Sequence, residues 1–408
     1  MHVLSNIFKR RLGLTGLALI VVTGIFAVRV GTYDPFRGAA VVNPPFNSLT
    51  YGVQAFLWWD RRVSQLHLEW MRLMVFSHVK QIFPWDDLEK RPGEWDFFRA
   101  DQVVDEVESK GLKLVIRLSD SPDWSRTTVE GEKGVDFVDA PPDDLADFGA
   151  YCGTVASRYK GRVAAYQIWN EPNLSREWGG KPPNAAEYVA LLMVCSDAIH
   201  AADPAAIRIS AGLAPTATDD ATAQPDEQYF HAMYDAGFEQ YVNAVGMHAP
   251  GYSSPDLSLE QARQQGIASW ATFRHVEDLR RIMVERSDAA HQVAILEFGW
   301  TTDPRPDSDY HWFAVTEDEQ AHNLVAAYQY AADNWRPWVG LMSAIYIGKS
   351  TWTPDDEEYW WSITTPLGNR PAFIALANMA KYCGDRTIPS RAPDSPEALG
   401  LATVTPCD

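Results

Sequence analysis

Two glutamates stand where a pair of carboxylates could do acid–base and nucleophilic chemistry. Glu171 follows an apolar run that ends in Trp169, and Glu297 ends the apolar run before Trp300. Cleavage of a glycosidic bond needs one protonated carboxyl to donate to the leaving oxygen and one ionised carboxylate to attack the anomeric carbon. Apolar walls raise the pKa of one such group, and hydrogen bonds hold the other ionised. We therefore predict that Glu171 and Glu297 together supply the acid/base and the nucleophile of such a reaction.

Eight short apolar runs alternate with helical stretches and would position these residues. We expect strands at Tyr51–Leu57, Val79–Phe83, Lys113–Leu118, Ala164–Trp169, Ile207–Gly212, Ala244–His248, Gln292–Glu297 and Gly340–Ile347. This alternation predicts a parallel sheet, and eight strands close a (β/α)8 TIM barrel, an α/β fold. A doubly wound sheet is the alternative, but no glycine-rich phosphate turn follows the first strand. In a barrel the ends of strands four and seven converge at the mouth, where active sites lie.

Helix starts and composition divide the chain further. Asn184, Ser258 and Thr316 each have Glu or Gln three residues later, the pattern of a capping box. We expect a cytoplasmic stub and apolar helix at 1–30, a linker at 31–49, the catalytic barrel at 50–384 and a proline-rich tail at 385–408.

The segment around the first glutamate resembles a known family signature. Residues 169–173 read Trp-Asn-Glu-Pro-Asn and resemble the strand-four motif of clan A glycoside hydrolases, and residues 79–96 are similar to strand two and its loop in glycoside hydrolase family 39 and related families. This resemblance implies that Glu171 is the acid/base, that Asn170 binds the sugar 2-hydroxyl, and that Glu297 is the nucleophile of a retaining reaction. Such chemistry requires neither a metal nor an organic cofactor.

Residues near the end of strand six are further candidates. The resemblance implies that His248 hydrogen-bonds the nucleophile and holds it ionised, whereas a satisfied core histidine is the alternative. Tyr252, four residues later, either makes the same contact or lines a subsite.

Sixteen tryptophans suggest aromatic stacking on sugars, although aromatic residues are also ordinary core. We expect Trp85, Trp300 and Trp352 to bind substrate, and of Trp360 and Trp361 we expect one to face the site.

The chain departs from the family pattern at strand eight, where many members of the clan have a tryptophan. Here either Tyr346 or Trp352 substitutes, or the platform is absent. Lys80 and Lys349 either bind acidic sugars or form salt bridges with acidic loops, and we favour the salt bridges.

The N-terminus carries a basic cluster followed by an apolar segment. Lys9, Arg10 and Arg11 precede seventeen residues without charge, Leu12–Val28. We expect an uncleaved membrane anchor with the remainder outside the cytoplasm, since basic residues stay inside. A cleaved signal peptide, giving a secreted protein, and a buried core helix are the alternatives.

Charge and cysteines restrict the partners. The formal net charge is −19, which disfavours nucleic acid and anionic lipid surfaces. No cysteine pair has metal-ligand spacing. Cys152 with Cys195 and Cys383 with Cys407 would form disulfides in an oxidising compartment, and free buried thiols are the alternative for the first pair. The sequence indicates no protein partner.

The expected substrate is an extracellular oligo- or polysaccharide. Loops after strands two, four and eight are long and favour an open cleft and endo action, whereas an exo enzyme would close one end. P-loop, zinc-protease and serine-hydrolase motifs are missing from the sequence. A transglycosidase using the same residues remains open, as does a membrane-tethered, non-catalytic carbohydrate-binding or envelope-scaffold protein.

Overall fold

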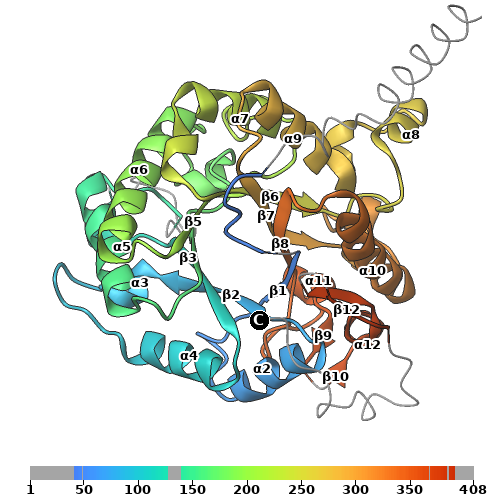
Figure 1. Ribbon diagram of the computed structural model, residues 1–408, viewed down its shortest axis with the longest axis horizontal. Coiled ribbons are helices and arrows are strands. Elements are labelled where there is room, and N and C mark those ends of the chain that lie inside the picture. Colours follow the sequence, from blue (N-terminus) through green and yellow to red (C-terminus); the bar gives the residue numbers. More distant parts are fainter. Residues whose placement is uncertain (1–40, 48, 127–138, 367, 384–385, 391–408) are drawn as a thin grey trace, which may run out of the picture.

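A closed parallel barrel forms the centre of the molecule in the computed structural model, which describes residues 41–47, 49–126, 139–366, 368–383 and 386–390 (Figure 1). Its eight strands pair in sequence order, and the last pairs with the first. They are β1 (Thr50–Gln54), β2 (His78–Pro84), β3 (Lys113–Ser119), β4 (Ala165–Ile168), β5 (Ile207–Ser210), β6 (Ala244–Pro250), β7 (Gln292–Gly299) and β8 (Val339–Ala344). The predicted TIM-barrel fold is confirmed.

Helices lie between the strands in the sequence, and in Figure 1 the long ones surround the barrel. The helices are α2 (Ser64–Leu73), α3 (Trp85–Leu88), α4 (Phe98–Ser109), α5 (Leu145–Arg158), α6 (Ala185–Ala202), α7 (Asp226–Asp235), α8 (Leu259–Gln264), α9 (Val276–Glu285), α10 (Glu317–Asn334), α11 (Glu357–Trp361) and α12 (Pro371–Asn378). Two short hairpins complete the described chain: β9 (Thr364–Thr365) with β10 (Gly368–Asn369), and β11 (Lys381–Cys383) with β12 (Arg386–Ile388).

The predicted helix starts and strands agree closely with the structure. Ser258 and Thr316 form complete capping boxes, and Asn184 caps α6 by accepting from two backbone N–H groups. Every predicted strand overlaps a barrel strand. The first overruns by three residues, because Ala55–Leu57 continues the apolar pattern as a largely buried loop rather than in the sheet.

The interior of the barrel is packed by aliphatic side chains and closed by one aromatic residue. The interior cluster consists of Phe46, Val115, Ala165, Ile209, Ala244, Ala294, Leu296 and Leu341. The backbone of Phe46 exchanges two hydrogen bonds of 3.0 Å with the Gln292 side chain at the start of β7. Phe46 therefore lies at the N-terminal end of the barrel, and the C-terminal end is left for a site.

Helices α5 and α6, which precede and follow β4, are joined by a disulfide between Cys152 and Cys195. Gly149 and Gly153 on α5 allow a close approach, since a Cβ at either position would lie 3.4 Å from α6 atoms. The first predicted pairing is confirmed. Cys407 lies outside the described residues, so the pairing predicted for Cys383 stays a prediction.

Among the described residues, α6 is the one helix that is long and apolar enough to cross a membrane. It packs on α5 and carries the disulfide, so it serves here as a barrel helix. The predicted anchor at Leu12–Val28 lies outside the described residues.

We expect Phe46→Ala to destabilise the barrel, because Phe46 is 4% exposed and its ring fills the barrel end. A Phe-to-Ala cavity in a core lowers the free energy of unfolding by about 3–5 kcal/mol. Urea unfolding followed by circular dichroism measures this. The matched control is Phe98→Ala on α4, where the ring is 62% exposed; an equal loss in both variants would contradict the assignment.

Candidate active site

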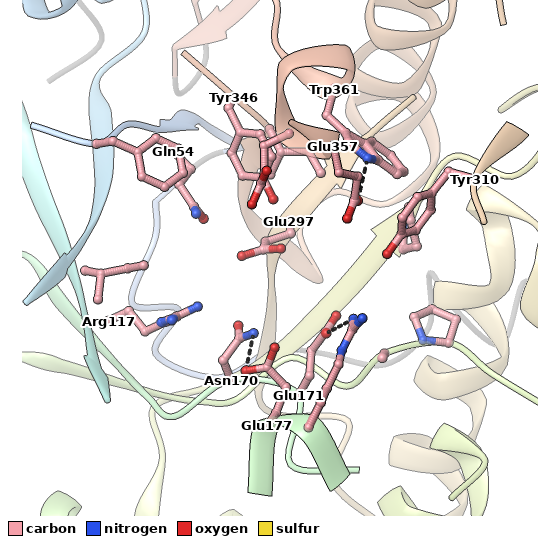
Figure 2. Close-up of a pocket in the computed structure, with 18 of the residues that line it drawn as sticks. Gln54, Arg117, Asn170, Glu171, Glu177, Glu297, Tyr310, Tyr346, Glu357 and Trp361 are labelled. Atoms are coloured by element: carbon pink, nitrogen blue, oxygen red, sulfur yellow. Dashed lines mark hydrogen bonds and ion pairs between the residues drawn. The ribbon is translucent and has the colours of Figure 1, made fainter. Parts of the chain in front are cut away.

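A cavity of about 440 Å³ opens at the carboxyl ends of the strands (Figure 2). Figure 2 shows Glu297 on one side and Asn170 and Glu171 on the other, with their polar atoms directed into the space between them. The lining residues include carboxylates, arginines and aromatics: Gln54, Phe56, Arg117, Asn170, Glu171, Arg176, Glu177, Tyr252, Glu297, Tyr310, Phe313, Tyr346, Glu357, Glu358 and Trp361. The two predicted catalytic carboxylates thus share one cavity.

Glu171 is placed by an unusual backbone turn after β4. Trp169 and Glu171 have φ values of +69° and +36°, the left-handed region that non-glycine residues rarely adopt. Such conformations cost about 1–3 kcal/mol each and persist where surrounding contacts enforce them. Here the Glu171 N–H donates to Gly212 O at 3.0 Å, and the Trp169 indole N–H donates to Glu177 O at 2.8 Å. These contacts direct the Glu171 carboxylate into the cavity.

His248 hydrogen-bonds Glu171, so the predicted hydrogen bond to Glu297 was wrong, although the charge of His248 still lowers the pKa of Glu297. Its Nδ1 lies 2.8 Å from Glu171 Oε1, while Arg176 Nη2 lies 3.6 Å from Glu171 Oε2. Burial alone would raise the pKa of Glu171, but the His248 hydrogen bond and charge, together with Arg176, lower it below its usual value. His248 is the register partner of Glu297, but its ring packs against Gly212, after β5, and so extends towards Glu171 instead.

Lys80 holds the nucleophile candidate. Its Nζ donates to Glu297 Oε1 at 2.7 Å and to Leu296 O at 3.3 Å, and its side chain is fully buried. Burial would raise the pKa of Glu297, but Lys80 and then His248 offset this and hold it at about 2. Glu297 is therefore ionised at neutral pH, and Lys80 forms a salt bridge with it rather than with an acidic loop.

Both the oxygen and the nitrogen of the Asn170 side-chain amide form hydrogen bonds. Gln167 Nε2 donates to its Oδ1 at 3.3 Å, and its own Nδ2 donates to Glu177 Oε2 at 3.4 Å. Burial, and then the charges of Asp139 and Glu171, raise the pKa of Glu177 to about 8. A third carboxyl near the two predicted catalytic glutamates is thus largely protonated at neutral pH.

The three predicted tryptophans do not line the cavity. Trp85 is buried, stacks on Tyr151 at 5.2 Å and donates to Glu89. Trp300 is also buried and donates to Ser253 O at 3.0 Å.

Trp352 lies behind the cavity wall rather than in it. Its ring contacts Phe56 at 4.6 Å and Tyr346 at 5.7 Å, and these two rings line the cavity. Of the alternatives at strand eight, Tyr346 therefore takes the position at the site. Tyr252 lines the cavity as predicted, and of the last tryptophan pair Trp361 does.

The sequence did not lead us to predict that Arg117 and Glu177 line the cavity, or that Lys80 pairs with Glu297. A signal for two of them was present, since Lys80 and Arg117 are charged residues inside two of the predicted strands. A charged residue inside a buried strand of a closed barrel points to a partner at the mouth. For Glu177, on the short 3-10 turn Ser175–Trp178 after the motif, no such pattern existed.

One histidine–carboxylate group outside the cavity could be considered for a metal: Glu227, His275 and Asp278. His275 Nε2 lies 2.8 Å from Asp226. Burial lowers the pKa of His275, but Asp226 and Asp278 together raise it to about 10. His275 thus forms ion pairs with the carboxylates around it.

No protein-family model matches the sequence, and no curated protein matches it. Solved structures do match in fold. The chain superposes on a family 39 glycoside hydrolase from Bacteroides cellulosilyticus WH2 with a TM-score of 0.60 and 17% identity, covering 83% of this chain and 64% of that one. The chain thus spans just under two thirds of that neighbour's length.

Two other neighbours have the same fold. A family 39 β-xylosidase from Caulobacter crescentus gives a TM-score of 0.55 at 18% identity, with 83% of this chain and 72% of that chain covered. Xylanase 10B from Thermotoga maritima gives 0.52 at 15% identity, with 81% and 94% covered. The resemblance to clan A glycoside hydrolases inferred from the sequence is therefore confirmed for the barrel fold.

Three of the carboxyls that line the cavity should titrate in separate ranges. We expect Glu297 to titrate near pH 2, Glu171 below its ordinary range and Glu177 near pH 8. Carbon NMR of the protein labelled at the glutamate side-chain carboxyls measures each step. Glu177→Gln should remove the alkaline step alone, and an alkaline step that survives this substitution would refute the assignment.

Lys80→Met should raise the pKa of Glu297, because it removes the cation that opposes the effect of burial. We expect an upward shift of about one unit or more in the same titration. Lys349→Met is the matched control, since Lys349 lies over the Trp59 ring and forms no ion pair with Glu297. Equal pKa values in the two variants would show that Lys80 does not set the charge state.

Proposed function

We propose that the chain is a retaining glycoside hydrolase, with Glu171 as acid/base and Glu297 as nucleophile. The observation that carries the proposal is that the two carboxylates in the cavity have different partners. Glu297 is held ionised by a buried lysine, whereas Glu171 shares a hydrogen bond with a histidine. Glycosidic cleavage by double displacement needs such a division of roles.

In the first step, a Glu297 oxygen attacks the anomeric carbon as the bond to the leaving oxygen breaks, and Glu171 donates its proton to that oxygen. The 2.8 Å hydrogen bond between Glu171 and His248 holds a proton beside this carboxylate. A sugar in the cavity displaces water, and the added burial raises the pKa of Glu171 towards the protonated form. Asn170, fixed by Gln167 and Glu177, is positioned to hydrogen-bond the substrate.

In the second step, Glu171 removes a proton from water while the water oxygen attacks the anomeric carbon and Glu297 leaves. The charge of Glu297 raises the pKa of Glu171. Esterification of Glu297 removes that charge, so the pKa of Glu171 falls and the residue changes from acid to base. The repulsion between the two carboxylates thus favours the acid form of Glu171 in the first step, and its loss favours the base form in the second.

We propose an oligo- or polysaccharide of neutral sugars as substrate. Carboxylates outnumber cations among the lining residues, so an acidic sugar would be repelled. The neighbouring β-xylosidase and xylanase make β-linked neutral glycans the first substrates to test.

We further propose that the catalytic domain works outside the cytoplasm, membrane-anchored or secreted. The disulfide between Cys152 and Cys195 supports this, because such bonds persist in oxidising compartments. The basic cluster before Leu12–Val28 supports the anchored form.

Glu171→Gln and Glu297→Gln should both abolish cleavage of natural glycans. Loss of a general acid costs about 10²–10⁴-fold, and the cost falls for aryl glycosides with good leaving groups because they need little protonation. Glu297→Gln should be inactive on both, since no nucleophile remains. Rates on both substrate types separate the roles; equal residual activity of the two variants on aryl glycosides would contradict them.

The stereochemical outcome tests the retaining mechanism. Proton NMR of the first product formed should show the anomer of the substrate, because two inversions restore the configuration. The opposite anomer would refute a covalent intermediate on Glu297. Products longer than the substrate would indicate transfer to a sugar hydroxyl, and binding without cleavage would favour a non-catalytic carbohydrate-binding protein.

A further inference from the structure

A cluster of aromatic rings leads from the cavity to the protein surface. Tyr252, after β6, and Phe313, in the loop between β7 and α10, both line the cavity. Each also packs against Trp312, whose side chain is 62% exposed. Few large apolar side chains of the described residues are this exposed. Trp312 is one of them, and it packs directly on rings that line the cavity.

The Trp312 ring is held in a fixed orientation. Tyr252 stacks on it at 5.6 Å between ring centroids, with planes 7° apart, and so covers one face. Phe313 meets it edge-on at 4.7 Å and Trp270 at 6.4 Å. An aromatic side chain fixed in this way presents its other face with little conformational entropy left to lose on binding.

The buried Trp300 supports this cluster from below. Its indole N–H donates to Ser253 O at 3.0 Å. Gly251 lies so close to the ring that an added Cβ would stand 1.9 Å from it. The loop that carries Tyr252 is therefore packed onto a rigid base, which gives the buried tryptophan a role in placing the exposed one.

We propose that Trp312 forms a second subsite, which stacks on a neutral sugar ring of the same glycan chain that is cleaved in the cavity. The inference rests on the proposed function and extends it. Pyranose rings present C–H faces that pack on aromatic faces, and an exposed apolar patch beside a binding cavity marks a place where ligand continues. The shared residues Tyr252 and Phe313 make the platform continuous with the catalytic cavity.

A sugar bound at a distance contributes to the rate. Binding energy from a part of the substrate that does not react can be used to orient the reacting bond, so substrates that reach Trp312 should have higher kcat/KM than those that do not. The platform thus favours a polymer or long oligosaccharide over a disaccharide.

The test compares Trp312→Ala and Trp312→Tyr with Phe98→Ala. Phe98 is also 62% exposed, but it lies on α4 and does not line the cavity, so it controls for loss of a surface ring. The probes are neutral β-linked xylo-, gluco-, manno- and galacto-oligosaccharides of increasing length. Binding is measured by calorimetry in a Glu297→Gln background, and kcat/KM is measured with Glu297 intact.

We expect Trp312→Ala to lower the ratio of kcat/KM for long over short probes about 10-fold or more. Its affinity for long probes should fall in parallel, Trp312→Tyr should recover most of both, and Phe98→Ala should match the parent. An unchanged ratio, or no binding of any probe by the parent, overturns the subsite. Binding that depends on Trp312 without any cleavage keeps the subsite and overturns the hydrolase, so the two failures are distinguishable.

Discussion

The buried contact between Lys80 and Glu297 is the interaction on which the site depends. A carboxylate and an ammonium removed from water each cost several kcal/mol, and the cost is offset only when the pair is close and hydrogen-bonded. Here the ammonium has no exposed surface, lies 2.7 Å from the carboxylate and also donates to a backbone carbonyl. The arrangement requires β2 and β7, which are not adjacent, to direct both side chains to the barrel axis. Closure of the barrel achieves this.

The turn after β4 positions Glu171 in a different way from the strand that positions Glu297. Glu297 is a strand residue and is directed by the pleat, whereas Glu171 lies beyond its strand on a left-handed backbone. The short turn Ser175–Trp178 compensates, since it provides Arg176 for Glu171 and Glu177 for Asn170. Two adjacent side chains therefore set the surroundings of two adjacent motif residues, and strain at the motif is held by neighbours rather than by the strand.

Strand periodicity and strand order were enough to predict the barrel and to place both carboxylates at its mouth, whereas the prediction for Asn170 came from the resemblance to clan A. The tryptophan predictions failed on a point that the same periodicity could have decided. Trp85 stands three residues beyond Ile82, and Trp300 three beyond Glu297, and both reference residues line the cavity. An odd spacing along a strand places a residue on the opposite face, towards the helices.

The partner of His248 could not be predicted in this way. It depends on where the His248 ring packs and on how far a side chain reaches across the barrel, which are properties of the assembled fold.

The disulfide between α5 and α6 bears on how the molecule opens. It closes a loop of 43 residues that contains β4 and Glu171. When this part of the barrel opens, the covalent link therefore keeps α5 and α6 close together. Local opening should be least frequent here and more frequent in segments outside the loop. Hydrogen exchange would then be slower around Glu171 than in segments outside the loop. The covalent link would thus keep the turn that carries Glu171 in place even when segments outside the loop open.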